Sequence, residues 1–278
     1  MSYQHIKVNA LSPSVGAEIS GVDLTRPLEP AVLAEIRQAF LAHGVVFFHD
    51  QPMSFEDQRR LAEYFGELHI HVGGKGTASK TLEGYPEVRK QHFDRNSKRV
   101  SGEVWHTDQS CSRVPPMASI LHQHLIPPDG GGDTLFASMY AAYEALSDKM
   151  KAYLEGLTAT HDGALIFDKG GEDEYPVASH PVITVHPETG RKILFVNRGQ
   201  TAYINEVSRA ESRAILAYLF DHIEQPEWQM RFHWRNHSVA FWDNRCTQHR
   251  AIWDYWPNVR SGYRMQIKGV EAPRAPQA

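Results

Sequence analysis

The sequence predicts an α+β fold that is mainly β, with a β-sandwich or barrel at its centre and helices around it. Segments typical of strands dominate both ends of the chain, and segments with helical periodicity come before and between them. No internal repeat and no Pro- or Ser-rich linker interrupts the 278 residues. We therefore expect residues 1–278 to form a single domain, which is long enough to bury a substantial core.

Composition excludes several classes of protein. With 41% hydrophobic and 22% charged residues the chain is an ordinary globular protein, and its net charge of −4 does not favour nucleic acid or a membrane surface as a partner. Two cysteines make no disulfide framework, which favours a reducing compartment. The first residues lack the apolar core of a signal peptide, and no apolar run is long enough to span a bilayer. The expected location is cytoplasmic.

The N-terminal quarter predicts two strands, a helix, a strand and a second helix. Loose alternation between Ile6 and Leu24 indicates a strand pair with a glycine-assisted turn. Pro30 is suited to the first turn of a helix that Gly44 ends, and residues 45–48 are apolar enough for a buried strand. Ser54, with Asp57 three residues later, is typical of a capped helix start.

Two later stretches lack clear periodicity. Residues 69–102 and 162–179 are rich in glycine and charge and poor in apolar anchors. Loops of this length in a compact domain are lids, binding loops or disordered segments. Because the first of them leads directly into the metal-ligand motif described below, we interpret both as covers of a site. The Pro- and Ala-rich tail, residues 272–278, is expected to be frayed.

The remaining elements alternate between helices and strands. Helical spacing of apolar residues predicts a helix over 138–157, and Ser208 with Glu211 forms the capping box of another. The turn at residues 187–190 predicts a hairpin. Strands are expected at 117–126, 182–186, 192–196, 229–234, 239–242 and 260–270.

The tetrapeptide Trp105-His106-Thr107-Asp108 is a candidate metal-binding motif. Side chains at positions i and i+2 of a strand project from the same face, so His106 and Asp108 can converge on one ion. His249 follows a strand and a polar turn and could supply a third ligand. Two histidines and one carboxylate that leave a face open suit non-haem Fe(II). Taken singly, each residue could equally be a polar surface or turn residue.

Arg260 and Arg264 are four residues apart on an expected strand, so both face the same side, roughly 13 Å apart at ~3.3 Å per residue. A buried arginine requires an anion. Two of them beside a metal suggest two carboxylate-type groups, one for each arginine. The alternative is a pair of surface arginines on an edge strand.

Together these motifs resemble the TauD/TfdA family of Fe(II)- and 2-oxoglutarate-dependent dioxygenases. The resemblance rests on His106-x-Asp108, Gly131-Gly132-Asp133-Thr134, His249 and the Arg260/Arg264 pair, in that order, and it extends from Gly16 to Arg264. It implies a double-stranded β-helix, or jelly roll, flanked by α-helices. It also implies oxidation of 2-oxoglutarate to succinate and CO2, with O2 as the oxidant.

The resemblance also implies a role for each matching residue. His106, Asp108 and His249 would hold Fe(II), while Thr134 and Arg260 would bind the far carboxylate of 2-oxoglutarate. In addition, Arg264 and His71 occupy the positions that bind the primary substrate. Family members are often dimers or tetramers, which implies a homo-oligomer.

Two departures bear on the substrate. The taurine enzyme of the family has Asn four residues before the first metal histidine and Tyr three residues after the substrate histidine, where this chain has Gly102 and Gly74. These glycines predict a roomier pocket. We therefore expect a small organic anion with an apolar body, either an aryloxyalkanoate, an alkyl sulfate or a sulfonate-like acid. The alternative within the family is a taurine-type sulfonate dioxygenase.

Two further readings belong to other functional classes. Two histidines and a carboxylate also bind Zn(II) with an open fourth position, as in hydrolases. Such an enzyme would not need Thr134 and Arg260. The second alternative is a non-catalytic, cupin-like binding protein with a vestigial site.

Overall fold

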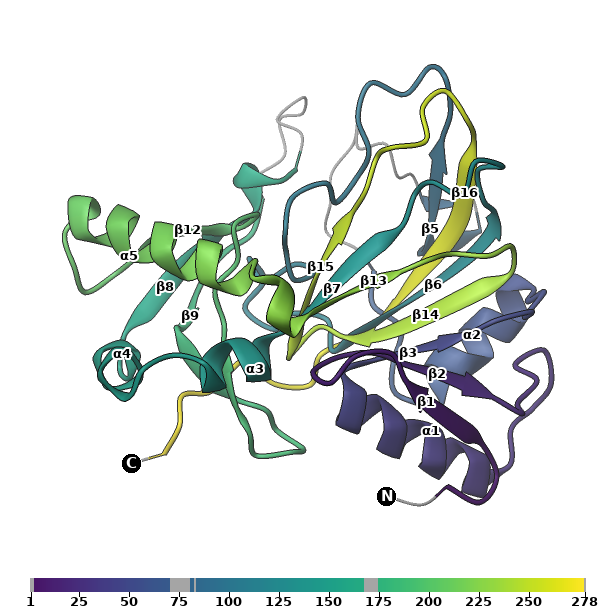
Figure 1. Ribbon diagram of the computed structural model, residues 1–278, viewed down its shortest axis with the longest axis horizontal. Coiled ribbons are helices and arrows are strands. Elements are labelled where there is room, and N and C mark those ends of the chain that lie inside the picture. Colours follow the sequence, from purple (N-terminus) through teal and green to yellow (C-terminus); the bar gives the residue numbers. More distant parts are fainter. Residues whose placement is uncertain (1–2, 71–80, 83, 168–174, 278) are drawn as a thin grey trace.

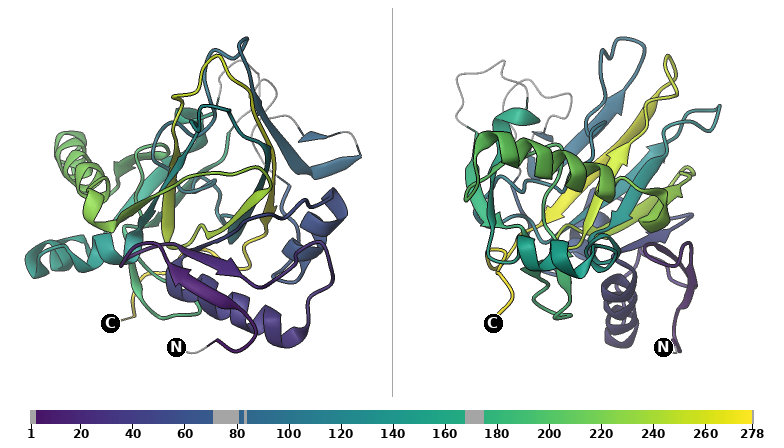
Figure 2. Two further views of the ribbon diagram at one scale, coloured as in Figure 1. Left: turned by 45° about the vertical axis from the view of Figure 1, so that its right-hand side comes forward. Right: turned by 60° about the vertical axis from the view of Figure 1, so that its left-hand side comes forward.

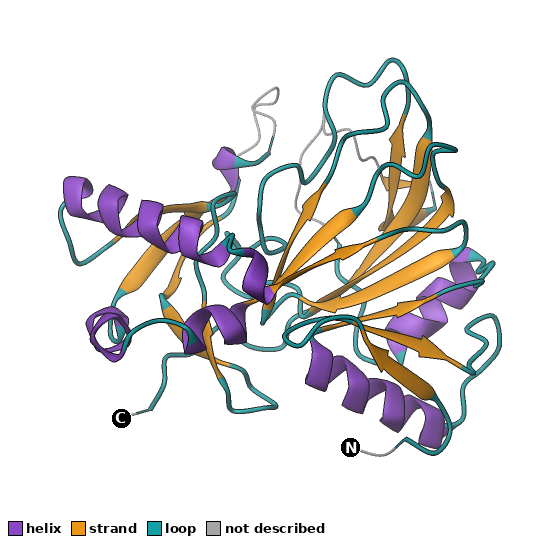
Figure 3. Ribbon diagram, in the orientation of Figure 1, coloured by secondary structure: helices purple, strands orange, loops and turns teal. Residues whose placement is uncertain are grey.

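The computed structural model describes residues 3–70, 81–82, 84–167 and 175–277. Within these ranges the chain forms sixteen β-strands and five α-helices, so the expected mixed and mainly β composition is confirmed (Figure 3). None of the helices in the described ranges has the length and apolar character needed to cross a membrane.

A main sheet of eight strands runs in the order β1-β2-β3-β14-β6-β16-β5-β4. Its neighbouring strands are antiparallel except for β2 and β3, which are parallel. The strands are β1 (Lys7–Ala10), β2 (Ala17–Ser20), β3 (Val45–Phe48), β4 (Thr81–Leu82), β5 (Tyr85–Phe93), β6 (Ala118–Leu125), β14 (Ser238–Asp243) and β16 (Arg260–Ile267).

A smaller antiparallel sheet packs face to face on this one. It consists, in order, of β13 (Gln229–Phe232), β7 (Thr134–Ser138) and β15 (Thr247–Ala251). Aromatic side chains fill the space between the sheets: Phe47 of the main sheet stacks on Phe232 at 3.8 Å between ring centroids and meets Phe136 edge-on. Burial of such rings stabilises the pairing of the two sheets, because each removes a large apolar area from water.

Two helices cover the outer face of the main sheet, as Figures 1 and 2 show: α1 (Pro30–His43) and α2 (Phe55–Glu63). The predicted end signals are confirmed. Pro30 lies in the first turn of α1, and Gly44 ends that helix with a φ of +70°, a conformation that favours glycine. Ser54 and Asp57 form a reciprocal capping box at the start of α2.

The other helices gather with two small sheets on the opposite side of the molecule (Figure 1). The predicted helix over 138–157 is in fact two helices. Ser147 accepts a hydrogen bond from the backbone N–H of Met150 and thereby caps a new helix. The elements here are α3 (Met139–Glu144), α4 (Asp148–Leu154), β8 (Thr158–Asp162), β9 (Val177–Pro181), β10 (Ile183–Val185), β11 (Lys192–Leu194), β12 (Thr201–Ile204) and α5 (Arg209–Ile223).

The stretch 69–102 is less irregular than the sequence indicated, because it contains β5, a nine-residue strand of the main sheet. Apolar alternation is missing from β5 because Arg89 and Gln91 project into a polar cavity. The prediction of a strand around His106 was also wrong. In the structure His106 forms an isolated antiparallel bridge with His249 and continues into a turn.

Candidate active site

Backbone hydrogen bonds hold the two candidate histidine ligands side by side. The His249 N–H donates to His106 O at 2.9 Å, and the His106 N–H donates to His249 O at 3.2 Å. His249 is the middle residue of β15, which follows the predicted turn after β14. Pairing of the two segments sets the imidazoles 4.2 Å apart between ring centroids. Two residues separated by more than 140 positions therefore share one site.

Asp108 completes the cluster from two residues further along the chain. Its Oδ1 lies 3.6 Å from His106 Nε2 and accepts a hydrogen bond from Arg264 Nη1 at 2.9 Å. Its Oδ2 accepts from the Ser119 hydroxyl at 2.6 Å. Burial alone would raise the pKa of this carboxyl, but the Arg264 guanidinium and the neighbouring histidines hold its pKa well below the ordinary value. Asp108 is therefore a carboxylate at neutral pH.

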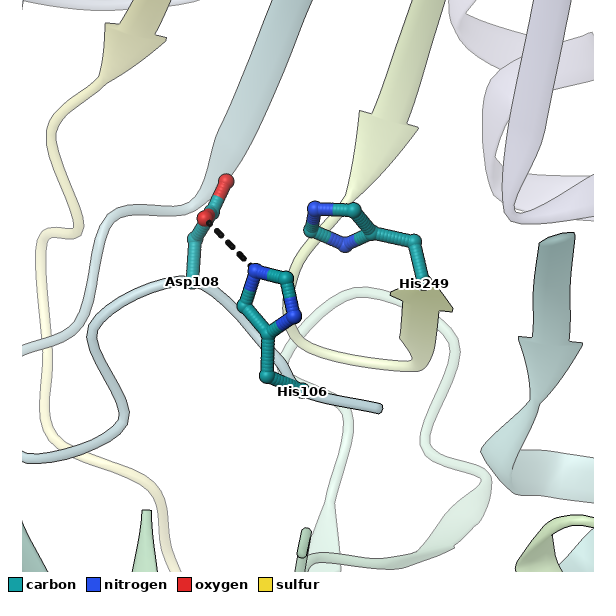
Figure 4. A group of neighbouring side chains, drawn as sticks. All are labelled: His106, Asp108 and His249. Atoms are coloured by element: carbon teal, nitrogen blue, oxygen red, sulfur yellow. Dashed lines mark ion pairs between the residues drawn. The ribbon is translucent and has the colours of Figure 1, made fainter. Parts of the chain in front are cut away.

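The side chains of His106, Asp108 and His249 point toward one another (Figure 4), and one ligand atom from each lies within 4.8 Å of the other two. Burial, together with the nearby His106 and Arg264, holds the pKa of His249 well below its ordinary value, against the opposing effect of Asp108. The His249 imidazole is thus neutral at pH 7. A neutral imidazole has a lone pair available for a metal ion.

This donor set fits a divalent metal ion. His106 Nδ1 donates to the carbonyl of Val104 at 2.8 Å, so Nε2, on the side of Asp108, is the ring nitrogen that can bind a metal. In His249, Nδ1 is buried with no hydrogen-bond partner among the described residues. One carboxylate and two imidazoles are the ligands of non-haem Fe(II) sites that keep positions open for substrate.

A second buried group, His186, Asp243 and Cys246, has similar spacing but does not fit a metal. Arg245 donates to both carboxylate oxygens of Asp243, at 2.8 and 2.7 Å, and His186 Nε2 lies 3.0 Å from Oδ2. Burial also raises the pKa of the Cys246 thiol well above its ordinary value, so no thiolate forms. We assign this group a structural role.

A cavity of about 290 Å³ opens beside His106, Asp108 and His249. Apolar walls come from Leu121, Phe136 and Trp242, while arginines supply positive charge. Parts of both stretches that the sequence suggested as covers, residues 99–102 and 165–167, also line it.

Arg260 and Thr134 lie together in this cavity. Arg260 is 3% exposed, and its guanidinium carbon lies 5.4 Å from the centre of the Trp234 ring. The Trp234 indole N–H donates to Thr134 Oγ1 at 3.0 Å. Burial lowers the pKa of Arg260 to about 10, against the opposing effects of Tyr255 and Asp133, so the side chain stays charged at neutral pH. This burial excludes the alternative that Arg260 is a surface residue.

Arg264 is buried in the same cavity, at 8% exposed, and pairs with Asp108 as described above. The structure thus brings together six of the seven residues singled out in the sequence. The seventh, His71, lies outside the described residues, as does Gly74.

Sequence reasoning missed two polar residues of the site. Ser119, on β6, holds Asp108 Oδ2, and nothing in its own strand sequence marks it. Arg89, on β5, is 4% exposed and lines the cavity. Burial and the neighbouring Arg264 lower the pKa of Arg89 to about 9, which leaves it positively charged at neutral pH. Arg89 can be recognised as a cavity residue only from its position opposite Arg264, and that position is known only once the two strands are paired.

Comparison with known proteins agrees with this geometry. The family model described as "Taurine catabolism dioxygenase TauD, TfdA family" matches residues 7–266. An alkylsulfatase of Acinetobacter baylyi is 30% identical over 96% of this chain and 86% of its own length. The alpha-ketoglutarate-dependent 2,4-dichlorophenoxyacetate dioxygenase of Cupriavidus pinatubonensis is 30% identical over 88% of this chain and 92% of its own.

Solved structures superpose over nearly the whole chain. A taurine dioxygenase from Burkholderia xenovorans matches with a TM-score of 0.86 and 36% identity, covering 98% of this chain and 94% of that one. The crystal structure of AAD-2 in complex with Mn(II) and N-oxalylglycine matches with a TM-score of 0.87 and 28% identity, covering 98% of this chain and all of that one.

Proposed function

This chain belongs to the TauD/TfdA family and is a 2-oxoglutarate-dependent dioxygenase, and we propose that it uses Fe(II) held by His106, Asp108 and His249 to hydroxylate a small organic anion. The observation that carries the proposal is the convergence of these three buried ligands at a cavity that also contains buried arginines. Family membership selects this function over the zinc hydrolase and the non-catalytic binding protein.

When bound, Fe(II) supplies the activation of O2 that couples decarboxylation of 2-oxoglutarate to oxidation of the substrate. The protein contributes a neutral His249, an ionised Asp108 and a His106 whose tautomer is set by the Val104 carbonyl. Because His249 and Asp108 are in the required protonation states at neutral pH, neither needs to lose a proton when the metal binds.

For 2-oxoglutarate, we propose that Arg260 and Thr134 bind the far carboxylate. The buried guanidinium presents a planar fork that matches a carboxylate, and a charge-assisted pair of this kind is strong when water is excluded. Gln123, in the amide orientation that satisfies both of its polar groups, accepts from Arg260 Nη1 at 2.9 Å and Nη2 at 3.2 Å, which fixes the direction of the fork.

The cavity walls also serve the reaction, because Phe136, Trp242 and Leu121 keep water from the reacting C–H bond. We propose that the stretches 69–102 and 162–179 act as covers over the bound substrate. Their described parts at 99–102 and 165–167 already line the cavity, which supports this assignment. For the fold, we infer a single domain with a jelly-roll core, supported by the face-to-face packing of the two antiparallel sheets.

For the primary substrate, we propose a sulfonate, a sulfate ester or an aryloxyalkanoate whose anionic group binds Arg264, with His71 as a further contact. The relatives named above act on molecules of these kinds. Taurine itself is a less suitable substrate, because this chain has Gly102 where the taurine enzyme has Asn. A side chain there would crowd His106, because a Cβ added to Gly102 would lie 3.1 Å from His106 Cε1.

The test is succinate formation by the purified protein with Fe(II), 2-oxoglutarate and O2, in the presence of taurine, an alkyl sulfate or an aryloxyacetate. We expect substrate-dependent succinate with the sulfate or the aryloxyacetate, and little with taurine. Equal turnover of taurine would contradict the proposed substrate class. Failure of every acid to stimulate succinate formation would contradict the proposed activity.

A further inference from the structure

A chain of buried amide side chains continues outward from Asp108. The Ser119 hydroxyl donates to Asp108 Oδ2 at 2.6 Å, and Gln266 Nε2 donates to the Ser119 oxygen at 3.1 Å. Gln109 Nε2 in turn donates to Gln266 Oε1 at 2.7 Å, and Gln109 Oε1 lies 3.2 Å from His69 Nε2. The serine and both glutamines are buried. A continuous path of hydrogen bonds therefore connects the carboxylate to His69.

The ionised Asp108 fixes the direction of every bond in this path. A carboxylate can only accept, so the single proton of the Ser119 hydroxyl is used on Asp108, and the Ser119 oxygen must accept from Gln266. Gln266 then presents its NH2 group to Ser119 and its carbonyl oxygen to Gln109, which orients the Gln109 amide in the same way. The last acceptor, Gln109 Oε1, requires a proton on His69 Nε2.

The same directionality acts on the carboxylate. Reversal of the Gln266 amide would turn its oxygen toward Ser119, where it would compete with Asp108 for the hydroxyl proton. The bond between Gln266 Oε1 and Gln109 Nε2 opposes that reversal. Hydrogen bonds in a buried path also polarise one another, so the donors behind Ser119 strengthen its bond to Asp108. Oδ2 is thereby held, and Oδ1 stays on the side of His106.

The backbone at Gln109 is an independent sign of a constrained position. Gln109 directly follows Asp108 and has a φ of +51°, in the left-handed region that residues other than glycine rarely adopt. Such a conformation persists where surrounding contacts hold it, and it is concentrated at functional sites. Here the oxygen and the nitrogen of the Gln109 side-chain amide are both hydrogen-bonded. The residue next to a metal ligand is thus tied to β16, on which Gln266 lies.

We propose that Gln266 and Gln109 are positioning residues for the metal site: they direct the Ser119 hydroxyl at Asp108 and so hold the carboxylate in the orientation that binds the metal. Neither supplies a ligand, and each acts through its neighbour in the path. The inference rests on the proposed function, since it assumes that Asp108 binds the metal.

The test compares metal affinity in single and double variants. Gln266→Met and Gln109→Met replace each amide with an uncharged side chain of similar length, and each is combined with Ser119→Ala. Gln58→Met is the matched control, because Gln58 is a buried glutamine whose Nε2 donates to backbone carbonyls of the same two strands, β6 and β16, from α2 on the outer face of the sheet.

Three quantities are measured for each protein. Anaerobic titration gives the dissociation constant for Co(II), and the visible absorption of bound Co(II) reports the arrangement of its ligands. Urea unfolding of the metal-free protein gives the free energy of unfolding. A purely structural glutamine would change only the last of these.

Gln266→Met should weaken Co(II) binding roughly 10-fold, the lower end of the usual effect of deleting a partner that orients a ligand. Gln109→Met should weaken it about 3-fold, because it acts through one more bond. In the Ser119→Ala background neither change should alter the affinity by more than about 2-fold, since the hydroxyl through which both act is absent. The Co(II) spectrum should change in Gln266→Met as it does in Ser119→Ala. Gln58→Met should lower the free energy of unfolding and leave the affinity and the spectrum unchanged.

A Gln266→Met variant with wild-type Co(II) affinity and spectrum would overturn the proposal. A loss of affinity that adds in full to that of Ser119→Ala would also overturn it, because Gln266 would then not act through Ser119. If Gln266→Met does not fold, Gln109→Met alone and combined with Ser119→Ala decides the question in the same way. The proposed activity fails differently, through absence of substrate-dependent succinate, and these metal affinities are measured independently of turnover.

Discussion

At the scale of single residues, Ser119 shows how the site is organised around its carboxylate. The Ser119 hydroxyl donates to Asp108 Oδ2 at 2.6 Å and accepts from the Asn244 and Gln266 side-chain amides at 3.0 and 3.1 Å. A hydroxyl has one proton to donate and two lone pairs. Because both amides occupy the lone pairs, the proton is directed at Asp108, and Oδ2 is held while Oδ1 faces His106.

Replacing Ser119 with alanine should therefore weaken metal binding without removing a ligand. We expect a loss of about 10- to 100-fold in affinity, the usual effect of deleting a partner that orients a ligand. Titration with Fe(II) or Co(II) under anaerobic conditions measures it. Ser238→Ala is the control. It removes a buried hydroxyl that lies in the same sheet as Ser119 but contacts His49 instead of a metal ligand. Equal metal affinity in both variants would show that Ser119 does not orient Asp108.

At the scale of elements, local signals and pairing contribute differently to what the sequence could predict. Helix starts at Ser54 and Ser208 were predictable because a capping box involves neighbouring residues only. The three candidate metal ligands were predictable from residue type and order, and the structure brings them together. Strand β5 and the burial of Arg89 in the cavity were not predictable. An inward-facing arginine resembles a loop residue in the sequence until its partner strand is known.

The stretch 69–102 ends at Gly102, and the contact of this residue with His106 can be tested. Gly102 has a φ of +82°, and a Cβ there would lie 3.1 Å from His106 Cε1. Gly84 has a φ of +81° and nothing within 4 Å of an added Cβ. Alanine at either position should cost about 1 kcal/mol through backbone strain. Only Gly102→Ala should also weaken metal binding, because it displaces the imidazole.

Denaturant unfolding measures the stability of the two glycine variants, and metal titration measures their affinity. If Gly84→Ala reduced metal affinity as much as Gly102→Ala, backbone strain rather than contact with His106 would be responsible.

At the scale of the whole molecule, buried neutral histidines make stability depend on pH. His122, in the middle of the main sheet, is 4% exposed, and burial, aided by His237 and His124, lowers its pKa from 6.5 to about 4. Below pH 6.5 the unfolded chain takes up a proton that the folded chain does not. The stability contributed by neutral His122 is therefore complete above pH 6.5 and is lost as the pH falls toward 4.

We expect His122→Leu to reduce the loss of unfolding free energy between pH 6.5 and 4. Since one pKa unit corresponds to about 1.4 kcal/mol, the reduction should be of the order of 2–3 kcal/mol. Urea unfolding at a series of pH values measures it, with His5→Gln, at an exposed position, as the control. Parallel pH profiles for the wild type and His122→Leu would contradict the assignment.

The fold brings His106, Asp108 and His249 to one point, and the proposed chemistry depends on that convergence. The most direct test is anaerobic addition of one equivalent of Fe(II) and excess 2-oxoglutarate, followed by visible absorption. A metal-to-ligand charge-transfer band should form in the wild-type protein and be absent from His249→Ala at the same concentrations. A band of equal intensity in His249→Ala would contradict the assigned metal site.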